Sequence, residues 1–195
     1  MSPLPRFHRL PAERREAILA VAREQFAAHG PETASYNKII EAAGFSKTAA
    51  YQYFDGRDDL LAAVLEDVRE RLLGVLGPWG PADGPDDFWA RLRAGTGALG
   101  AHLAAHPDDL ALAERAVRVS GGGPWTAWFD ALVRDGRRLG VVRTTVDHSL
   151  LVAATEAVLR AADGWALEKL RAGDHEVEDE QVWALLAGLW GGEGP

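Results

Sequence analysis

The 195-residue sequence contains no cysteine, which excludes disulfide bonds and cysteine-ligated metal centres. It also has no uninterrupted apolar run of the ~20 residues that span a bilayer. The N-terminal stretch MSPLPRFHRL is not followed by the apolar segment of a signal peptide. These absences favour a cytoplasmic protein with no membrane partner.

Alternating runs of β-branched residues are scarce as well, whereas Ala, Leu, Glu and Arg are abundant and apolar residues recur at helical spacing. Ile18, Val21, Ala22 and Phe26, for example, share one helical face. The sequence therefore predicts an all-α protein of about nine helices. The predicted helices cover approximately residues 11–29, 36–43, 47–54, 55–76, 86–105, 108–119, 124–138, 147–171 and 179–190.

Positive charge is in short supply, since the net charge is -8. The charge is unevenly distributed, however. Up to Phe54 the sequence has seven Lys or Arg and five acids, a net charge of +2, so the remainder carries -10. DNA binding requires a local basic surface rather than a basic protein. An acidic body would help to orient a mildly basic N-terminal headpiece towards DNA.

Two short helices with a sharp turn between them are predicted from Ser35 to Phe54. Ser35 and Ser46 are candidate N-caps, and Gly44 in the turn permits the positive φ that lets the second helix cross the first steeply. One set of apolar residues is expected to pack inward. These are Phe26, Ile39, Phe45, Ala50, Phe54 and Leu60.

The opposite face of the second of these helices carries polar side chains. Lys47, Thr48, Tyr51, Gln52 and Tyr53 supply an ammonium group, hydroxyls and an amide. Such groups suit base edges in the major groove and DNA phosphates. The pattern predicts a helix-turn-helix DNA-binding headpiece.

The run ETASYNKIIEAAGFSKTAAYQYFDGRDDLLAAVL (Glu32–Leu65) resembles the TetR family of bacterial repressors. The matching features are Ser35, Ile39, the turn Ala42–Lys47, Tyr51, Phe54 and an acid-rich helix start that leads to Leu60. The resemblance implies DNA contacts from two helix starts and from a basic residue that opens the following helix. The predicted DNA-binding residues are Ser35, Tyr36, Asn37, Ser46, Lys47, Thr48, Ala49, Tyr51, Gln52, Tyr53 and Arg57.

Three positions depart from the family pattern. Arg57 replaces the usual Lys and keeps its charge. Thr48 and Ala49 stand where the family often has Gly and then Thr, so the usual hydroxyl contact at position 49 is lost. The resemblance divides the chain into a helix-turn-helix domain over residues 1–56 and a helical ligand-binding and dimerisation domain over residues 57–195.

The predicted helix 147–171 is apolar around nearly its whole circumference, and helix 179–190 is also rich in apolar residues. A helix of this kind is buried on more than one side. Two such helices from each of two subunits would form a four-helix bundle, and a two-fold dimer fits a palindromic operator. The alternative is burial within one subunit. The predicted interface residues are Leu151, Ala154, Val158, Ala162, Trp183, Leu186 and Trp190.

Seven tryptophans are a high count for this length. Aromatic residues on the C-terminal helices could line a cavity for a hydrophobic small molecule, or they could simply form the core. The predicted ligand-binding residues are Phe88, Trp89, Trp125, Trp128, Phe129 and Trp165.

Signals for other chemistry are weak. His102 and His106 are four residues apart, a spacing that can hold a metal, and we leave that question open while predicting neither a metal site nor a cofactor. No nucleophile elbow or carboxylate pair predicts an enzyme. We therefore expect a ligand-responsive regulator, a repressor that binds a palindromic DNA operator as a homodimer and is released by a hydrophobic effector. The alternative is an interaction protein whose helix-turn-helix reads no DNA.

Overall fold

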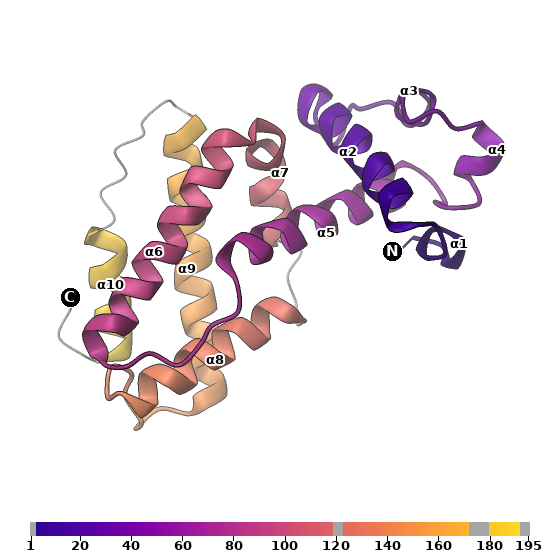
Figure 1. Cartoon of the computed structure of the whole chain (residues 1–195). Coiled ribbons are helices and arrows are strands. Elements are labelled where there is room, and N and C mark those ends of the chain that lie inside the picture. The colour runs from indigo at the N-terminus through magenta and orange to yellow at the C-terminus, as the bar shows by residue number, and fades with distance from the viewer. Residues whose placement is uncertain (1–2, 119–122, 172–179, 192–195) are drawn as a thin grey trace. The chain divides into compact units, whose positions relative to one another are not determined.

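The computed structural model describes residues 3–118, 123–171 and 180–191. All regular structure in these ranges is helical, which confirms the predicted all-α fold (Figure 1). The helices are α1 (Pro5–His8), α2 (Ala12–His29), α3 (Tyr36–Ala42), α4 (Lys47–Ala50), α5 (Arg57–Leu76), α6 (Pro85–Ala105), α7 (Pro107–Arg118), α8 (Pro124–Arg138), α9 (His148–Arg171) and α10 (Glu180–Trp190).

The predicted helices agree closely with the observed ones, with two differences. Helix α1 was not predicted, because four residues are too few to show a helical period. The helix predicted over 47–54 ends at Ala50. Residues 119 and 179, which the sequence assigns to helix ends, lie outside the described residues.

The chain forms two compact units. The first comprises Met1–Leu72 with Ala105–Ala116, and the second comprises Leu73–Ala104 with Val117–Pro195. The units are defined by packing, whereas the predicted domains 1–56 and 57–195 were defined by function, so that boundary stays a prediction. Every tyrosine of the sequence falls in the first unit and every tryptophan in the second.

The core of the first unit contains buried side chains from α2, α3, α4 and α5 and from the turn after α4. Phe26, Ile39, Ala50, Phe54 and Leu60 are all nearly inaccessible to solvent, as the sequence predicts. Phe45 is different, because it is only half-buried. The guanidinium carbon of Arg14 lies 5.1 Å from the centroid of the Phe45 ring, so this ring forms the edge of the core rather than its centre.

Ion pairs add a second connection within the first unit. Arg23 of α2 contacts Asp67 of α5 at 2.7 Å and Asp109 of α7 at 3.3 Å, and Arg71 of α5 contacts Asp109 at 3.1 Å. Asp109 is fully buried. Because a buried carboxylate is costly without cationic partners, these contacts fix α7 to α2 and α5.

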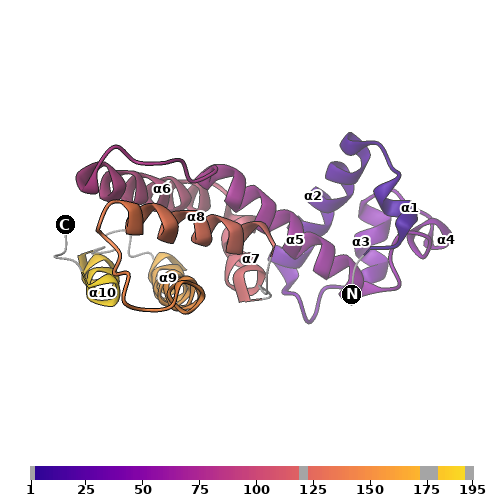
Figure 2. The same ribbon diagram turned by 90° about the horizontal axis from the view of Figure 1, so that it is seen from below.

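The core of the second unit is built largely from aromatic side chains of α6, α8 and α10. The Trp190 ring lies 5.3 Å from that of Trp89 and 5.8 Å from that of Phe88, between ring centroids. Its indole N–H donates to the buried hydroxyl of Thr155 on α9 at 2.9 Å. Helices α9 and α10 pack side by side (Figures 1 and 2).

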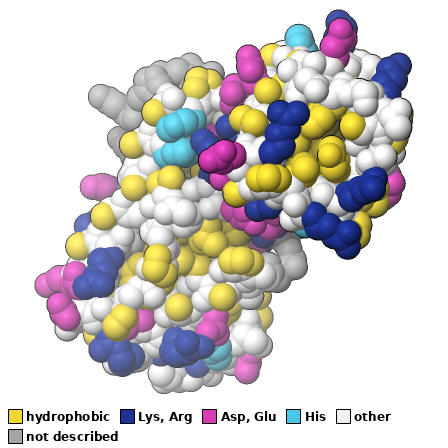
Figure 3. Space-filling model, turned by 45° about the vertical axis from the view of Figure 1, so that its right-hand side comes forward, with side chains coloured by type: hydrophobic (Ala, Val, Ile, Leu, Met, Phe, Trp, Pro, Cys, Tyr) yellow, Lys and Arg dark blue, Asp and Glu magenta, His cyan; other side chains and the backbone are white. Residues whose placement is uncertain are grey.

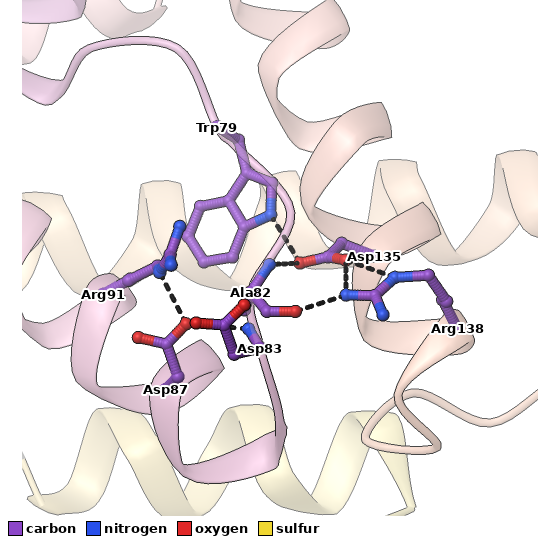
Figure 4. Close-up of polar contacts among 7 residues, drawn as sticks. All are labelled: Trp79, Ala82, Asp83, Asp87, Arg91, Asp135 and Arg138. Atoms are coloured by element: carbon purple, nitrogen blue, oxygen red, sulfur yellow. Dashed lines mark hydrogen bonds and ion pairs between the residues drawn. The ribbon is translucent and has the colours of Figure 1, made fainter.

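The Gly- and Pro-rich stretch between α5 and α6 breaks the helix as predicted, but it is fastened to α8. One carboxylate oxygen of Asp135 accepts hydrogen bonds from Trp79 Nε1 at 3.1 Å and from the Ala82 amide at 2.9 Å (Figure 4). Its other oxygen accepts from Arg138 at 2.6 Å. Burial alone would raise the pKa of Asp135, but these hydrogen bonds outweigh it and hold the pKa below its usual range.

Within the described residues, no helix is both long enough and apolar enough to cross a membrane.

Candidate DNA-binding site

Helices α3 and α4 form a helix-turn-helix. In the turn between them, Gly44 has φ +73°, a left-handed conformation that favours glycine. The Gly44 amide donates to the carbonyl of Glu41 at 3.0 Å, and the Phe45 amide donates to that of Ile40 at 2.9 Å. These bonds close the end of α3 and set the direction in which α4 starts.

The two predicted N-cap serines behave differently. Ser46 accepts a hydrogen bond from the Ala49 amide at 3.2 Å, so it caps α4 as predicted. Ser35 occupies the N-cap position of α3, but its side chain makes no capping bond. The exposed Ser35 hydroxyl is therefore not engaged in capping.

Helix α4 is shorter than predicted because the chain tightens after Ala50. The amides of Gln52 and Tyr53 donate to carbonyls three residues earlier, those of Ala49 and Ala50. Such i→i−3 bonds wind more tightly than an α-helix. Tyr51, Gln52 and Tyr53 thus belong to a turn, although they remain next to α4.

The predicted DNA-binding residues gather on α3, on α4, on the turn after α4 and at the start of α5. Most of them are exposed, including Tyr51 at 54%. The exposed ones are Ser35, Asn37, Ser46, Lys47, Thr48, Tyr51 and Gln52, and the half-buried ones are Tyr36, Ala49, Tyr53 and Arg57. On this unit, in the upper part of Figure 3, Lys and Arg side chains surround exposed hydrophobic ones.

Tyr36, at the start of α3, is half-buried and held by contacts with the turn after α4. Its hydroxyl donates to the carbonyl of Phe54 at 3.4 Å, and its ring centroid lies 5.7 Å from that of Tyr51. Burial, followed by the nearby Tyr51, Asp59 and Asp55, raises the pKa of Tyr36 to about 12. The hydroxyl is therefore protonated at physiological pH and keeps its capacity to donate.

Arg57, the predicted phosphate contact at the start of α5, already has partners within the chain. Its guanidinium pairs with Asp58 at 3.0 Å and donates to the carbonyl of Glu32. The hydrogen bond to Glu32 ties α5 to the segment before α3, whereas the contact with Asp58 lies within α5. A DNA phosphate would have to compete with Asp58 for this side chain.

The predicted ligand-binding aromatics separate into three groups. Phe88, Trp89 and Trp128 are buried in the core of the second unit. Trp165 is half-buried, with the Lys169 amine 4.7 Å from its ring centroid. Trp125 and Phe129 line a small recess that is open to solvent, together with Val117 of α7 and three residues of α9.

Those three residues, Glu156, Arg160 and Asp163, were not predicted from the sequence. They lie at helical positions i, i+4 and i+7, a spacing that places them on one face of α9 and could have identified them. Arg160 pairs with Glu156 across one helical turn.

The predicted interface residues prove to be distributed over two sides of their helices. Leu151, Trp183, Leu186 and Trp190 are covered within their own subunit, and Ala154, Val158 and Ala162 are half-buried. Among the exposed residues of α9 and α10, which include the polar Glu168 and Gln181, is an apolar set formed mostly by small residues. It consists of Leu150, Ala153, Ala157 and Ala161 on α9 and of Ala184, Leu185 and Gly188 on α10.

No cluster of three or more His, Asp or Glu side chains able to hold a metal was found in the described part of the chain. His102 and His106 both make interactions within the protein.

The fold and this surface define a helical regulator with an N-terminal helix-turn-helix. Residues 18–64 match the family model described as bacterial regulatory proteins, tetR family, so the chain carries the helix-turn-helix domain of TetR-family transcriptional regulators. No match was found among curated proteins.

Solved structures of regulators share the fold over most of the chain. A putative transcriptional regulator from Streptomyces coelicolor is 27% identical, with 90% of this chain and 94% of that one covered and a TM-score of 0.56. FadR from Bacillus subtilis, in complex with stearoyl-CoA, is 16% identical, with coverage of 91% and 98% and a TM-score of 0.62. SmeT, the repressor of a Stenotrophomonas maltophilia multidrug efflux pump, is 19% identical, with coverage of 94% and 90% and a TM-score of 0.60.

Proposed function

We propose that this protein is a ligand-responsive repressor that binds a palindromic double-stranded DNA operator as a homodimer and is released by a small hydrophobic effector. The observation that carries the DNA-binding part is the outer face of α4. Lys47 and Thr48 are exposed there, and Gln52 is exposed in the turn that follows. The buried side of the same segment, Ala50 and Phe54, anchors it to the core.

The chemistry of this face suits a major groove. An ammonium group can donate to guanine O6 and N7, an amide can pair with adenine, and a threonine can contact either bases or phosphates. Tyr51 adds a hydroxyl that suits phosphate. The first unit thereby provides both base-reading and phosphate-binding groups on one small helix and its flanking turn.

The homodimer is supported by the apolar outer face of α9 and α10. Leu150 and Leu185 are 60% and 62% exposed, which is unusual for large aliphatic side chains. Small residues beside them allow the helices of a second copy to approach closely. Pairing these faces across a two-fold axis would give a four-helix bundle and two helix-turn-helix units per dimer.

Effector binding is supported by the recess beside Trp125 and Phe129 in the second unit. Val117, Trp125 and Phe129 offer apolar contacts of the kind that small-molecule sites use. The recess is small and three of its six lining residues are charged, so an effector would have to widen it. Val117 lines the recess directly after the α7 segment that belongs to the first unit. The chain itself therefore links this site to the unit that carries α4. Repression is proposed by analogy with SmeT, a repressor, and a hydrophobic effector by analogy with FadR, whose structure is a complex with stearoyl-CoA.

The experiment is DNA binding by the purified full-length chain. Genomic fragments, including the region upstream of its own gene, are selected on the protein at low salt and the recovered duplex is titrated. Replacing Lys47 and Tyr51 by Ala should weaken binding by about 10- to 100-fold. The control is Arg134→Ala on α8, an exposed cation of the second unit.

Failure to recover any duplex, or equal binding by the Lys47/Tyr51 variant and the wild type, would contradict the proposal. Either result would instead favour a helical interaction protein whose helix-turn-helix does not read DNA. The engagement of Arg57 within the chain and the missing hydroxyl at Ala49 are the features that fit that second possibility.

A further inference from the structure

The N-terminal arm, residues 3–10, precedes the segment that matches the family model. It contains two arginines, one histidine and no acidic residue. Helix α1 occupies its centre. The arm is therefore a basic element for which the helix-turn-helix assignment gives no role.

Two contacts fix the arm beside the proposed DNA-binding surface. The Leu4 amide donates to the carbonyl of Tyr53 at 2.9 Å. The Phe7 side chain is only 3% exposed, and its ring centroid lies 4.8 Å from that of Phe54. The arm thus docks on the turn that directly follows α4.

The same contacts decide which side chains remain available. With Phe7 directed into the core, Arg6 and Arg9 are exposed on the arm. In the described ranges 3–118, 123–171 and 180–191, neither makes an ion pair or a side-chain hydrogen bond. Arg15, by contrast, is used to fasten the end of the arm, because it donates to the carbonyl of Leu10 at 2.7 Å.

A third arginine comes to this turn from α2. Arg14 lies over the ring of Phe45, and that ring is 5.8 Å from the ring of Tyr53 between centroids. Tyr53 is therefore the point where the arm, α2 and the turn after α4 meet. The exposed acids Glu13 and Glu16 on the first turns of α2 reduce this positive charge without pairing with the arm in the described structure.

We propose that the N-terminal arm is a second DNA-contacting element, in which Arg6 and Arg9 bind phosphates next to the bases read from α4. The proposal rests on the function proposed above. Guanidinium groups bind phosphate oxygens through paired hydrogen bonds, and phosphate contacts fix the position of a protein on DNA without selecting its sequence. The arm would strengthen binding to every duplex and leave the preferred sequence unchanged.

Salt dependence provides the test. The affinity of the full-length protein for the duplex recovered by genomic selection is measured at several KCl concentrations. Each phosphate contact contributes about 0.9 to the slope of log K against log salt. The double variant R6Q/R9Q should lower the magnitude of this slope by about 2, and the charge-preserving R6K/R9K should restore most of it.

The matched control R134Q removes an exposed arginine from α8 and should leave the slope at the wild-type value. Sequence selection by R6Q/R9Q should recover the wild-type motif, and its thermal melting should match that of the wild type. A wild-type slope in R6Q/R9Q overturns the arm proposal, and so does a changed motif. If the wild-type protein itself binds no DNA, the proposed function fails before the arm is tested.

Discussion

Asp135 shows how much of the second unit depends on one carboxylate. Its two oxygens accept hydrogen bonds from an indole, a backbone amide and a guanidinium, and these donors come from two separate parts of the chain. None of this can be recognised in the sequence, where Asp135 is one acid among many. A helical pattern identifies the faces of α8 but not the loop that folds against them.

Replacing Asp135 by Asn should lower the free energy of unfolding by about 1–3 kcal/mol, because the hydrogen bond to the arginine loses its charge and one acceptor becomes a donor. Chemical denaturation at neutral pH measures the loss. Asp86→Asn, at an exposed position of α6, is the control and should have little effect. Equal stability of the wild type and the Asp135 variant would contradict the assigned role.

Because the pKa of Asp135 is lowered in the folded protein, the stability that this side chain contributes depends on pH. The stabilisation is fully present above the pKa of the unfolded chain and is lost as the pH falls through the folded value. The difference between the wild type and Asp135→Asn should therefore shrink in acid. A difference that grows with acidity would contradict this account.

Helix turns and caps are the elements that the sequence predicts best, since their chemistry is local. Gly44 and Ser46 act as the pattern indicates, whereas Ser35 holds the N-cap position of α3 without making a capping bond. Tertiary contacts were less accessible to prediction. Phe7 gives helix α1 its place by packing on Phe54, and no local signal reveals that contact.

A pair of glycine substitutions separates backbone conformation from packing. A Cβ added at either Gly44 or Gly74 would meet no atom within 4 Å, but only Gly44 has a positive φ. Gly44→Ala should lose about 1 kcal/mol of stability, whereas Gly74→Ala, inside α5, should gain up to about 1 kcal/mol. Thermal melts of the two variants should move in opposite directions, and a parallel shift would count against the left-handed turn.

Helices α9 and α10 show what hydrophobic periodicity cannot predict. A helix that is apolar all round predicts two buried sides, but it does not say which side faces the subunit's own core. Leu151 and Leu186 are buried in the core of one subunit, whereas the neighbouring Leu150 and Leu185 are exposed to solvent. The interface on α9 and α10 therefore stays a prediction, and Leu151, Trp183, Leu186 and Trp190 are already buried within one subunit.

Leu185→Glu should convert the proposed dimer into monomers at micromolar concentration, since it places a charge in the centre of an apolar interface. Size-exclusion chromatography with light scattering measures the mass. Ala104→Glu adds the same charge to an exposed position of α6 and serves as the control. A wild type that is already monomeric would refute the interface altogether.

At the scale of the whole molecule, the acidic net charge of -8 is compatible with DNA binding because the helix-turn-helix segment up to Phe54 carries a net charge of +2. A homodimer carries two copies of this segment, so its binding site should consist of two half-sites related by a two-fold axis. Footprinting on the recovered duplex should show symmetric protection with two chains bound per site. Asymmetric protection by a single chain would contradict the dimeric mode.

The sequence was sufficient to identify the family and the helix-turn-helix, because both depend on residues close together in the chain. The recess was not predictable in the same way. It requires α7, α8 and α9 to meet, and only two of the six predicted aromatics, Trp125 and Phe129, line it. Of the other four, Phe88, Trp89 and Trp128 are buried in the core, and Trp165 is half-buried beside Lys169.

The division of tyrosines and tryptophans between the two units gives the protein two built-in optical reporters. Red-edge excitation selects the indole emission, which follows the second unit alone, while the tyrosine bands of second-derivative absorbance spectra, separated from the indole bands, follow the first. Melting curves recorded through each chromophore would coincide if the units unfold together and separate if they do not. An effector or a DNA duplex could then be assigned to the unit it stabilises without attaching any dye.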